Sequence, residues 1–268
     1  MKYQTVIYEK EGAVATLTLN RPDRFNSWDE QMTVEALAAV GEVAQDTGVG
    51  VLIITGAGKA FSAGAEIARL KGVVENPSDP KWVLERVHRT PSVVHLAVKI
   101  RNMDKPVIGA VNGIAAGAGF GIAMACDIRV ASEAARFSLI FIKRGLIPDC
   151  GSTYFLPRAV GMSKACEMAF TGEIIDAREA ERIGLVSRVV KAEELMKVTR
   201  ELATKIASGP RVALQLAKRA LYRGAIETDL AAQTDYELYL QNMCFQTRDF
   251  QEGVNSFLEK REPVFKGT

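Results

Sequence analysis

The stretch VIGAVNGIAAGAGFGIAMACD, residues Val107–Asp127, predicts the arrangement around which the rest of the chain is organised. It begins as an apolar run of strand type, passes the turn signal Asn112-Gly113, and continues through the small residues Ala115–Gly119 into an apolar helical pattern. A backbone without side chains lets a ligand approach closely, and the first free N–H groups of a helix can bind an anionic oxygen. Tight packing of a strand against a helix requires the same small residues, so this stretch alone leaves both interpretations open.

A second junction of the same kind comes earlier in the chain. Val51–Thr55 is a short, fully apolar segment typical of a buried strand, and the glycine- and alanine-rich segment Gly56–Ile67 follows it into a helix. Two such loops that converge can direct two backbone N–H groups at one carbonyl oxygen, which is an oxyanion hole worth a few kcal/mol per donor. Whether the two loops converge does not follow from the periodicity of the sequence.

The composition is that of an ordinary globular protein with a large core. Of the 268 residues, 48% are hydrophobic and 25% are charged, and the formal net charge of +2 gives no reason to expect a nucleic-acid partner. The four cysteines form no CxxC pair, which favours free thiols in a reducing compartment. Neither a signal peptide nor a membrane-length apolar run is present, so we expect a cytoplasmic protein without a membrane partner.

The pattern along the chain predicts an α/β core at residues 1–200, followed by a helical region at residues 201–268. A helix is expected from the N-cap residue Ser27 to about Gln45, because Glu30 completes a capping box. Helical patterns also cover most of Trp82–Arg101, the segment opened by Asp176, and everything after Ala192. The expected strands are Tyr3–Tyr8, Ala13–Leu19, Val51–Thr55, Val107–Val111, Ile128–Ala131 and Val186–Val190.

Several kinds of site are disfavoured by the sequence. No dinucleotide fingerprint follows the first strand and no P-loop occurs. The two histidines, His88 and His95, would lie about 10 Å apart along one helix, which is too far for one metal ion, so we expect no metal site. Asp149 lies in a Pro-Asp-Cys-Gly turn, where the residues alone favour a turn or cap over a catalytic role.

Taken together, six motifs make the chain resemble the enoyl-CoA hydratase/isomerase family of the crotonase superfamily over nearly its whole length. They are Leu19-Asn20-Arg21-Pro22 with Asn26, Phe61–Ile67, Lys105–Gly113, Cys126-Asp127, Gly145–Pro148 and Phe257–Arg261. The resemblance implies an α/β fold, a spiral of ββα units with C-terminal helices that form trimers, often paired into hexamers. It also implies chemistry on an acyl-CoA thioester through an enolate, with coenzyme A as part of the substrate and no separate cofactor.

The resemblance assigns the oxyanion-hole N–H groups to Ala65 and Ala118. Because backbone groups act there, alanine is acceptable at both positions. The further residues implied to bind CoA or the acyl group are Arg24, Phe25, Ala63, Gly64, Glu66, Ile67, Gly117, Phe141 and Lys260. Among them, Lys260 is as readily explained as an exposed surface charge. Lys71–Arg101 is expected to line the acyl pocket.

Two departures from the family pattern are informative. Hydratases of this family carry two glutamates, and the matching positions here are Gly121 and Phe141, neither of which can transfer a proton. Asp149 is the carboxylate that remains, and the surrounding motifs are most similar to those of epoxyphenylacetyl-CoA isomerase-like members. We therefore expect an isomerase in which Asp149 shuttles a proton and Phe141 helps to exclude water.

Three alternatives stay open at this point. The first is a hydratase of enoyl- or dienoyl-CoA that uses Asp149 and a second polar group. The second follows a haloaryl-CoA branch of the family, in which Asp149 would be a nucleophile assisted by His95. The third is a CoA-binding paralogue that has lost activity.

Overall fold

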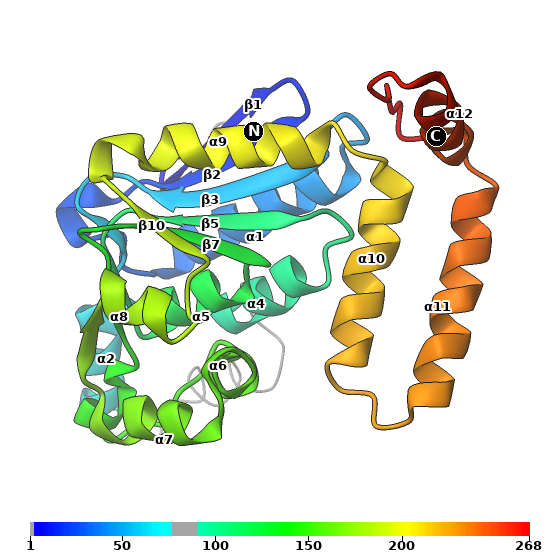
Figure 1. Cartoon of the computed structure of the whole chain (residues 1–268). Coiled ribbons are helices and arrows are strands. Elements are labelled where there is room, and N and C mark those ends of the chain that lie inside the picture. The colour runs from blue at the N-terminus through cyan, green and yellow to red at the C-terminus, as the bar shows by residue number, and fades with distance from the viewer. Residues whose placement is uncertain (1–2, 77–90) are drawn as a thin grey trace.

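The structure, a computed structural model, describes residues 3–76 and 91–268 and contains two sheets wrapped by helices (Figure 1). The six-stranded sheet has the order β1 (Val6–Glu11), β2 (Val14–Leu19), β3 (Val51–Gly56), β5 (Val107–Val111), β7 (Ile128–Ser132) and β10 (Arg188–Val190). The four-stranded sheet has the order β4 (Ala60–Ser62), β6 (Ile114–Ala116), β8 (Arg136–Ser138) and β9 (Ile174–Asp176). Only the β1–β2 and β8–β9 pairs are antiparallel among these strands.

The chain alternates between the two sheets in ββα units. β3, β5 and β7 each enter the large sheet, and β4, β6 and β8, which follow them, enter the small sheet. A helix comes next each time: α2 (Ile67–Glu75), α5 (Ala118–Ala125), or the 3-10 helix η2 (Ile140–Arg144) followed by α6 (Ser152–Val160). Because β4, β6 and β8 are neighbours in parallel, the loops that leave them lie at one edge of the small sheet. The predicted fold, with its ββα units, is confirmed.

The two faces of the central strand β3 pack against different helices, which explains its largely apolar sequence. Leu52 and Ile54 of β3 belong to the core shared with α1 (Glu30–Gln45) and α4 (Val93–Arg101). Their neighbours Val51 and Ile53 pack on the other side, where α9 (Leu195–Ala207) crosses the sheet (Figure 1). The period of two in side-chain direction divides the strand between these two cores.

Helix α1 ends at Gln45 as predicted, but the predicted N-cap is wrong. The N-cap is Asp29, whose carboxylate accepts a hydrogen bond of 2.8 Å from the Met32 amide. Ser27 is still in the preceding turn, where Phe25 and Asn26 are left-handed with φ of 50° and 53°. Trp28 is extended and pairs with the segment around Ala65, so the helix begins only after this pairing is complete.

The remaining elements agree with the predicted pattern in part. Asp176 caps its helix as expected, because its carboxylate accepts from the Glu179 amide. Residues 77–90, including His88 and part of the expected helix and acyl pocket, lie outside the described residues. Helix α6 was not predicted, and its internal Pro157 gives the sequence no clear helical signal there. The other short elements are η1 (Pro22–Arg24), α7 (Met162–Thr171), α8 (Ala177–Arg182) and η3 (Ala192–Glu194).

The last three helices project away from the sheets (Figure 1): α10 (Arg211–Gly224), α11 (Leu230–Phe245) and α12 (Arg248–Glu259). Asp127 fastens α10 to the core, because its carboxylate pairs with Lys218 at 2.8 Å and accepts from the Tyr222 hydroxyl at 2.6 Å. Burial and the nearby Asp127 charge raise the pKa of Tyr222, and burial lowers the pKa of Lys218. The predicted helical C-terminal region is present.

Candidate functional site

The two small-residue loops meet at the edge of the small sheet. Gly64 has φ of 94°, and a Cβ atom on it would lie 2.8 Å from the Ala116 carbonyl oxygen and 3.4 Å from the Ala118 nitrogen. A Cβ atom on Gly117 would in turn lie 3.8 Å from Cα of Gly64. Because Gly64 and Gly117 lack side chains, the backbones of the two loops come into contact. An oxyanion hole built from two loops requires such an approach.

The amides of Ala65 and Ala118 remain available at this junction, each for its own reason. Trp28 forms a parallel bridge with Ala65. Its amide donates to the Gly64 carbonyl at 2.8 Å, and its carbonyl accepts from the Glu66 amide at 3.1 Å. The Ala65 N–H group takes no part in these two hydrogen bonds. Ala118 is the first residue of α5, and the first amides of a helix have no intrahelical acceptor. Neither amide donates to another residue in the described parts of the chain.

The glycines of the 117–121 stretch have different structural roles. Gly117, with φ of 53°, makes the turn that exposes the Ala118 amide. Gly119 is a packing glycine, because a Cβ atom there would overlap the Ser62 backbone of β4. Close packing is therefore observed in this run, and the anion-binding interpretation stays a prediction.

Gly121 faces the loop that carries Asp149. A Cβ atom at position 121 would lie 2.5 Å from Cβ of Cys150 and 2.7 Å from the Cys150 oxygen. Asp149 therefore directly precedes a residue that contacts α5 at Gly121, three residues after Ala118. The side chain of Asp149 is exposed in the single chain, whereas Phe141 is buried and would lie 3.9 Å from a Cβ on Gly117.

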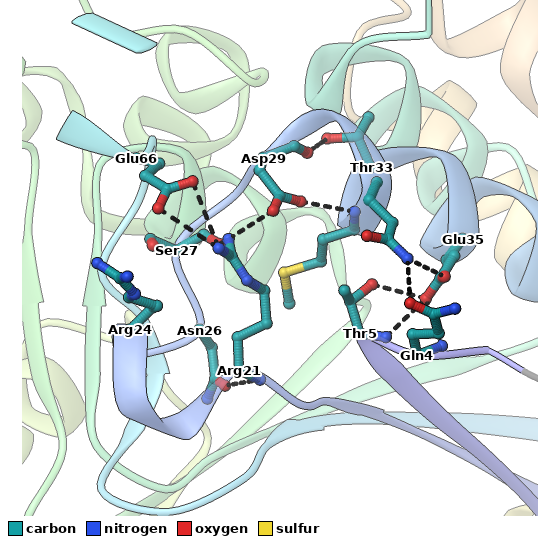
Figure 2. Close-up of polar contacts among 12 residues, drawn as sticks. Gln4, Thr5, Arg21, Arg24, Asn26, Ser27, Asp29, Thr33, Glu35 and Glu66 are labelled. Carbon is teal, nitrogen blue, oxygen red and sulfur yellow. Dashed lines mark hydrogen bonds and ion pairs between the residues drawn. The ribbon is translucent and has the colours of Figure 1, made fainter. Parts of the chain in front are cut away.

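Arg21 ties the Ala65 loop to the start of α1 (Figure 2). Its guanidinium donates to the Ser27 carbonyl at 2.7 Å, pairs with the Asp29 carboxylate at 3.0 Å, and reaches both Glu66 oxygens at 3.4 Å. The side chain is only 16% exposed, so the ion pairs are partly shielded from water. Because Glu66 directly follows Ala65, these contacts hold the residue next to the predicted oxyanion donor.

Two asparagines hold the turn that joins β3 to β4, on the other side of β4 from the Ala65 loop. The Asn26 side chain donates to the carbonyls of Ala57 and Ala60 and accepts from the Arg21 amide. Asn112 also donates to the Ala60 carbonyl and accepts from the Gly56 amide. Buried polar groups of this kind hold irregular backbone in one conformation because each lost partner is costly.

Metal and membrane sites are not found in the part of the chain that the structure describes. No three histidine, cysteine, aspartate or glutamate side chains there are grouped so that they could hold a metal ion. Likewise, none of the helices in residues 3–76 and 91–268 combines the length and apolar character needed to span a membrane.

Comparison with known proteins shows the family of this chain. The profile of the family described as "Enoyl-CoA hydratase/isomerase" matches residues 9–268. The chain belongs to the enoyl-CoA hydratase/isomerase family. It is 40% identical to a short-chain-enoyl-CoA hydratase of Clostridium acetobutylicum, over 98% of this chain and 97% of that protein. It is 38% identical to a 1,2-epoxyphenylacetyl-CoA isomerase of Escherichia coli, over 98% of both chains.

Solved structures of the family have the same fold. An enoyl-CoA hydratase subunit of Geobacillus kaustophilus superposes with a TM-score of 0.91 at 35% identity and covers all of both chains. An enoyl-CoA hydratase of Bacillus anthracis gives the same TM-score at 34% identity, over 99% of this chain and 100% of that one. Enzymatic chemistry on an acyl-CoA is therefore consistent with the family of this chain.

The other residues that the family resemblance assigned to CoA lie in two separate places. Arg24 and Phe25 are exposed beside the Ala65 loop, and 55% of Phe25 is accessible. Ala63 and Ile67 are exposed on either side of Ala65. By contrast, Lys260 is the exposed C-cap residue of α12, and α12 lies on the opposite side of the molecule from α2 (Figure 1). One chain does not bring Lys260 to the other residues.

His95 has a structural contact within its own helix. Its Nδ1 atom accepts a hydrogen bond of 3.2 Å from the Ser92 amide, in a capping box at the start of α4. Sequence reasoning missed this cap, and it also gave Arg21 no role beyond a family motif. An arginine in a turn carries no signal of its own, because its partners Asp29 and Glu66 are distant from each other in sequence.

Proposed function

We propose that this chain is an isomerase of enoyl-CoA thioesters that moves a double bond or opens a strained ring. The Ala65 and Ala118 N–H groups bind the thioester oxygen, and Asp149 transfers the proton. The observation that supports this best is the contact between Gly121 and Cys150. It leaves no room for the glutamate that a hydratase of this family carries at position 121, and it puts the Asp149 loop there instead.

The proposed reaction needs only one base. Asp149 removes a proton from one carbon of the acyl group, and the electron pair moves onto the thioester oxygen as an enolate. Two backbone N–H groups stabilise that charge, and each is worth roughly 3 kcal/mol in comparable sites. Asp149 then returns the proton to another carbon, so the product has the same atoms as the substrate.

Exclusion of water from the enolate favours isomerisation over hydration. Phe141 replaces the second hydratase glutamate with a buried aromatic ring. Asp149 is exposed in the single chain, so its enclosure has to come from the bound acyl-CoA or from a second subunit. In this proposal the reaction uses no cofactor besides the coenzyme A of the substrate.

We also propose a homotrimer, or a hexamer made of two trimers. Helices α10 to α12 expose large apolar side chains, including Leu221 at 75%, Leu230 at 78% and Phe257 at 83%. Apolar surface of this extent is usually covered in an assembly. In that assembly Lys260 would approach a phosphate of coenzyme A bound to a neighbouring subunit.

Hydration is the second candidate, because a hydratase from Clostridium acetobutylicum is among the similar relatives. It would need a group besides Asp149 to orient and deprotonate the water. Covalent catalysis by Asp149 has less support, since His95 caps α4. A CoA-binding paralogue without activity would bind thioesters and turn none over.

Replacement of Asp149 with Asn tests the proposal directly. Turnover of the best acyl-CoA from an aliphatic and aromatic panel should fall by at least about 10³-fold, because the side chain can no longer accept the proton. Binding of the same thioester should stay close to wild type. Asp104→Asn is the matched control, because Asp104 forms an exposed ion pair with Arg219 at the surface. Turnover in Asp149→Asn that equals the control would contradict the proposal.

A further inference from the structure

The loop that carries Asp149 makes a sharp bend immediately after it. Cys150 is 1% exposed and left-handed, with φ of 50°, and Gly151 is also left-handed, with φ of 76°. Gly151 is the N-cap residue of α6, and the Ser152 amide donates to the Asp149 carbonyl at 2.9 Å. Cys150 thus forms the buried inner side of the bend, and Asp149 is the residue immediately before it.

The bend rests on Gly121. A Cβ atom on Gly121 would lie 2.5 Å from Cβ of Cys150, 2.7 Å from its carbonyl oxygen and 3.2 Å from its carbonyl carbon. Two of these three atoms belong to the backbone and cannot rotate out of the way. Any other residue at position 121 would therefore push the bend, and with it Asp149, away from α5.

The same helix presents the oxyanion donor. Ala118 is the first residue of α5, and Gly121 follows three residues later, about one helical turn away. All residues of α5 are buried, so the helix is held as a rigid unit by its surroundings. The distance between the Ala118 N–H group and the Asp149 loop is consequently set by how closely Cys150 approaches position 121.

We propose that Gly121 is a positioning residue for proton transfer, and that its missing side chain fixes Asp149 at the working distance from the oxyanion hole. This inference rests on the proposed function. It also means that the site cannot become a hydratase by a single change to Glu at position 121, because the new side chain and the Asp149 loop compete for one space.

The test compares Gly121→Ala with Gly253→Ala, Cys150→Gly and the double variant Gly121→Ala/Cys150→Gly. The substrate is the acyl-CoA that wild type turns over fastest in the panel, and kcat and KM are measured separately. In Gly121→Ala we expect kcat to fall roughly a hundredfold, as for a displacement of about 1 Å, with little change in KM. The control Gly253→Ala adds a Cβ with ordinary 3.7 Å contacts in α12 and should leave kcat unchanged.

The double variant separates positioning from general damage to the fold. Cys150→Gly removes the nearest of the three atoms and lets the left-handed bend relax, so the double variant should recover about tenfold in kcat over Gly121→Ala. If Gly121→Ala does not fold, Cys150→Gly alone tests the contact, because a loosened bend should lower kcat severalfold at unchanged KM.

The outcomes distinguish this inference from the proposed function. A folded Gly121→Ala with wild-type kcat, or a wild-type kcat in Cys150→Gly, would overturn the positioning role while Asp149→Asn stays inactive. A fully active Asp149→Asn would overturn the proposed function itself. Equal loss in Gly121→Ala and the double variant would mean that the substitution damages α5 and does not displace the bend, which also overturns the inference.

Discussion

At the scale of single residues, the guanidinium of Arg21 is the side-chain group that joins the Ala65 loop to the start of α1. It bridges the Ser27 carbonyl and the carboxylates of Asp29 and Glu66 (Figure 2). Without it, two partly buried carboxylates would face each other across the gap. The loop position is therefore expected to depend on the planar, multiply donating shape of this side chain.

Replacement of Arg21 with Gln should lower kcat about tenfold or more and destabilise the fold by about 1–3 kcal/mol, because charged hydrogen bonds are lost. Urea unfolding and steady-state kinetics measure the two effects. Arg21→Lys keeps the charge without the forked geometry and should lie between wild type and Gln. Wild-type kcat in Arg21→Gln would show that the Ala65 loop holds its position unaided.

At the scale of elements, the buried strands and the two Gly/Ala junctions could be predicted because their signals are local. Val51–Thr55 and Val107–Val111 are almost entirely apolar, and such strands are buried on both faces. The sequence predicts the wrong start for α1, because the local capping box at Ser27 is overridden by a contact with a residue distant in the sequence. Trp28 pairs with Ala65, and this tertiary contact moves the cap to Asp29.

The cap assignment predicts different costs for two neighbouring alanine substitutions. Asp29→Ala should destabilise the protein by about 1 kcal/mol or more, because it removes the acceptor of the Met32 amide and one partner of Arg21. Ser27→Ala should cost less. Chemical unfolding of both variants checks the order, and an equal or larger loss in Ser27→Ala would restore Ser27 as the functional cap.

The site could be predicted only as far as the family pattern reaches. The two proposed oxyanion donors, Ala65 and Ala118, would act through their backbone N–H groups, so their side chains give no signal and the assignment rests on motif position. Gly121 and Cys150 are in contact although they are 29 positions apart in the chain. The sequence around a glycine in an apolar helix does not indicate which residue packs against it. Arg21 and Glu66 are likewise joined only by the fold.

At the scale of the whole molecule, helices α10 to α12 extend from the sheets and carry apolar side chains that one chain leaves uncovered (Figure 1). Helix α10 is held against the α/β core by the contacts of Lys218 and Tyr222 with Asp127. A rigid attachment with an exposed apolar surface is the arrangement expected of an oligomerisation region. Lys260, far from the site in its own chain, belongs to this same region.

Substitution of Phe257 with Asp should therefore weaken the assembly, because burying a charge in an apolar interface is costly. Sedimentation velocity should show smaller species than wild type, while circular dichroism remains unchanged. Val34→Asp in α1 is the control, since Val34 is also exposed but lies on the α/β core. An unaltered assembly in Phe257→Asp would place the interface elsewhere.

The central claim is that the site moves a proton within the acyl group and adds no water. The most direct measurement is mass spectrometry of the product formed from an enoyl-CoA in H₂¹⁸O and, separately, in D₂O. We predict a product without ¹⁸O, whose mass in D₂O exceeds that of the substrate by no more than the deuterium that the Asp149 proton exchanges with the solvent. A product heavier by one molecule of labelled water would contradict the account and identify a hydratase.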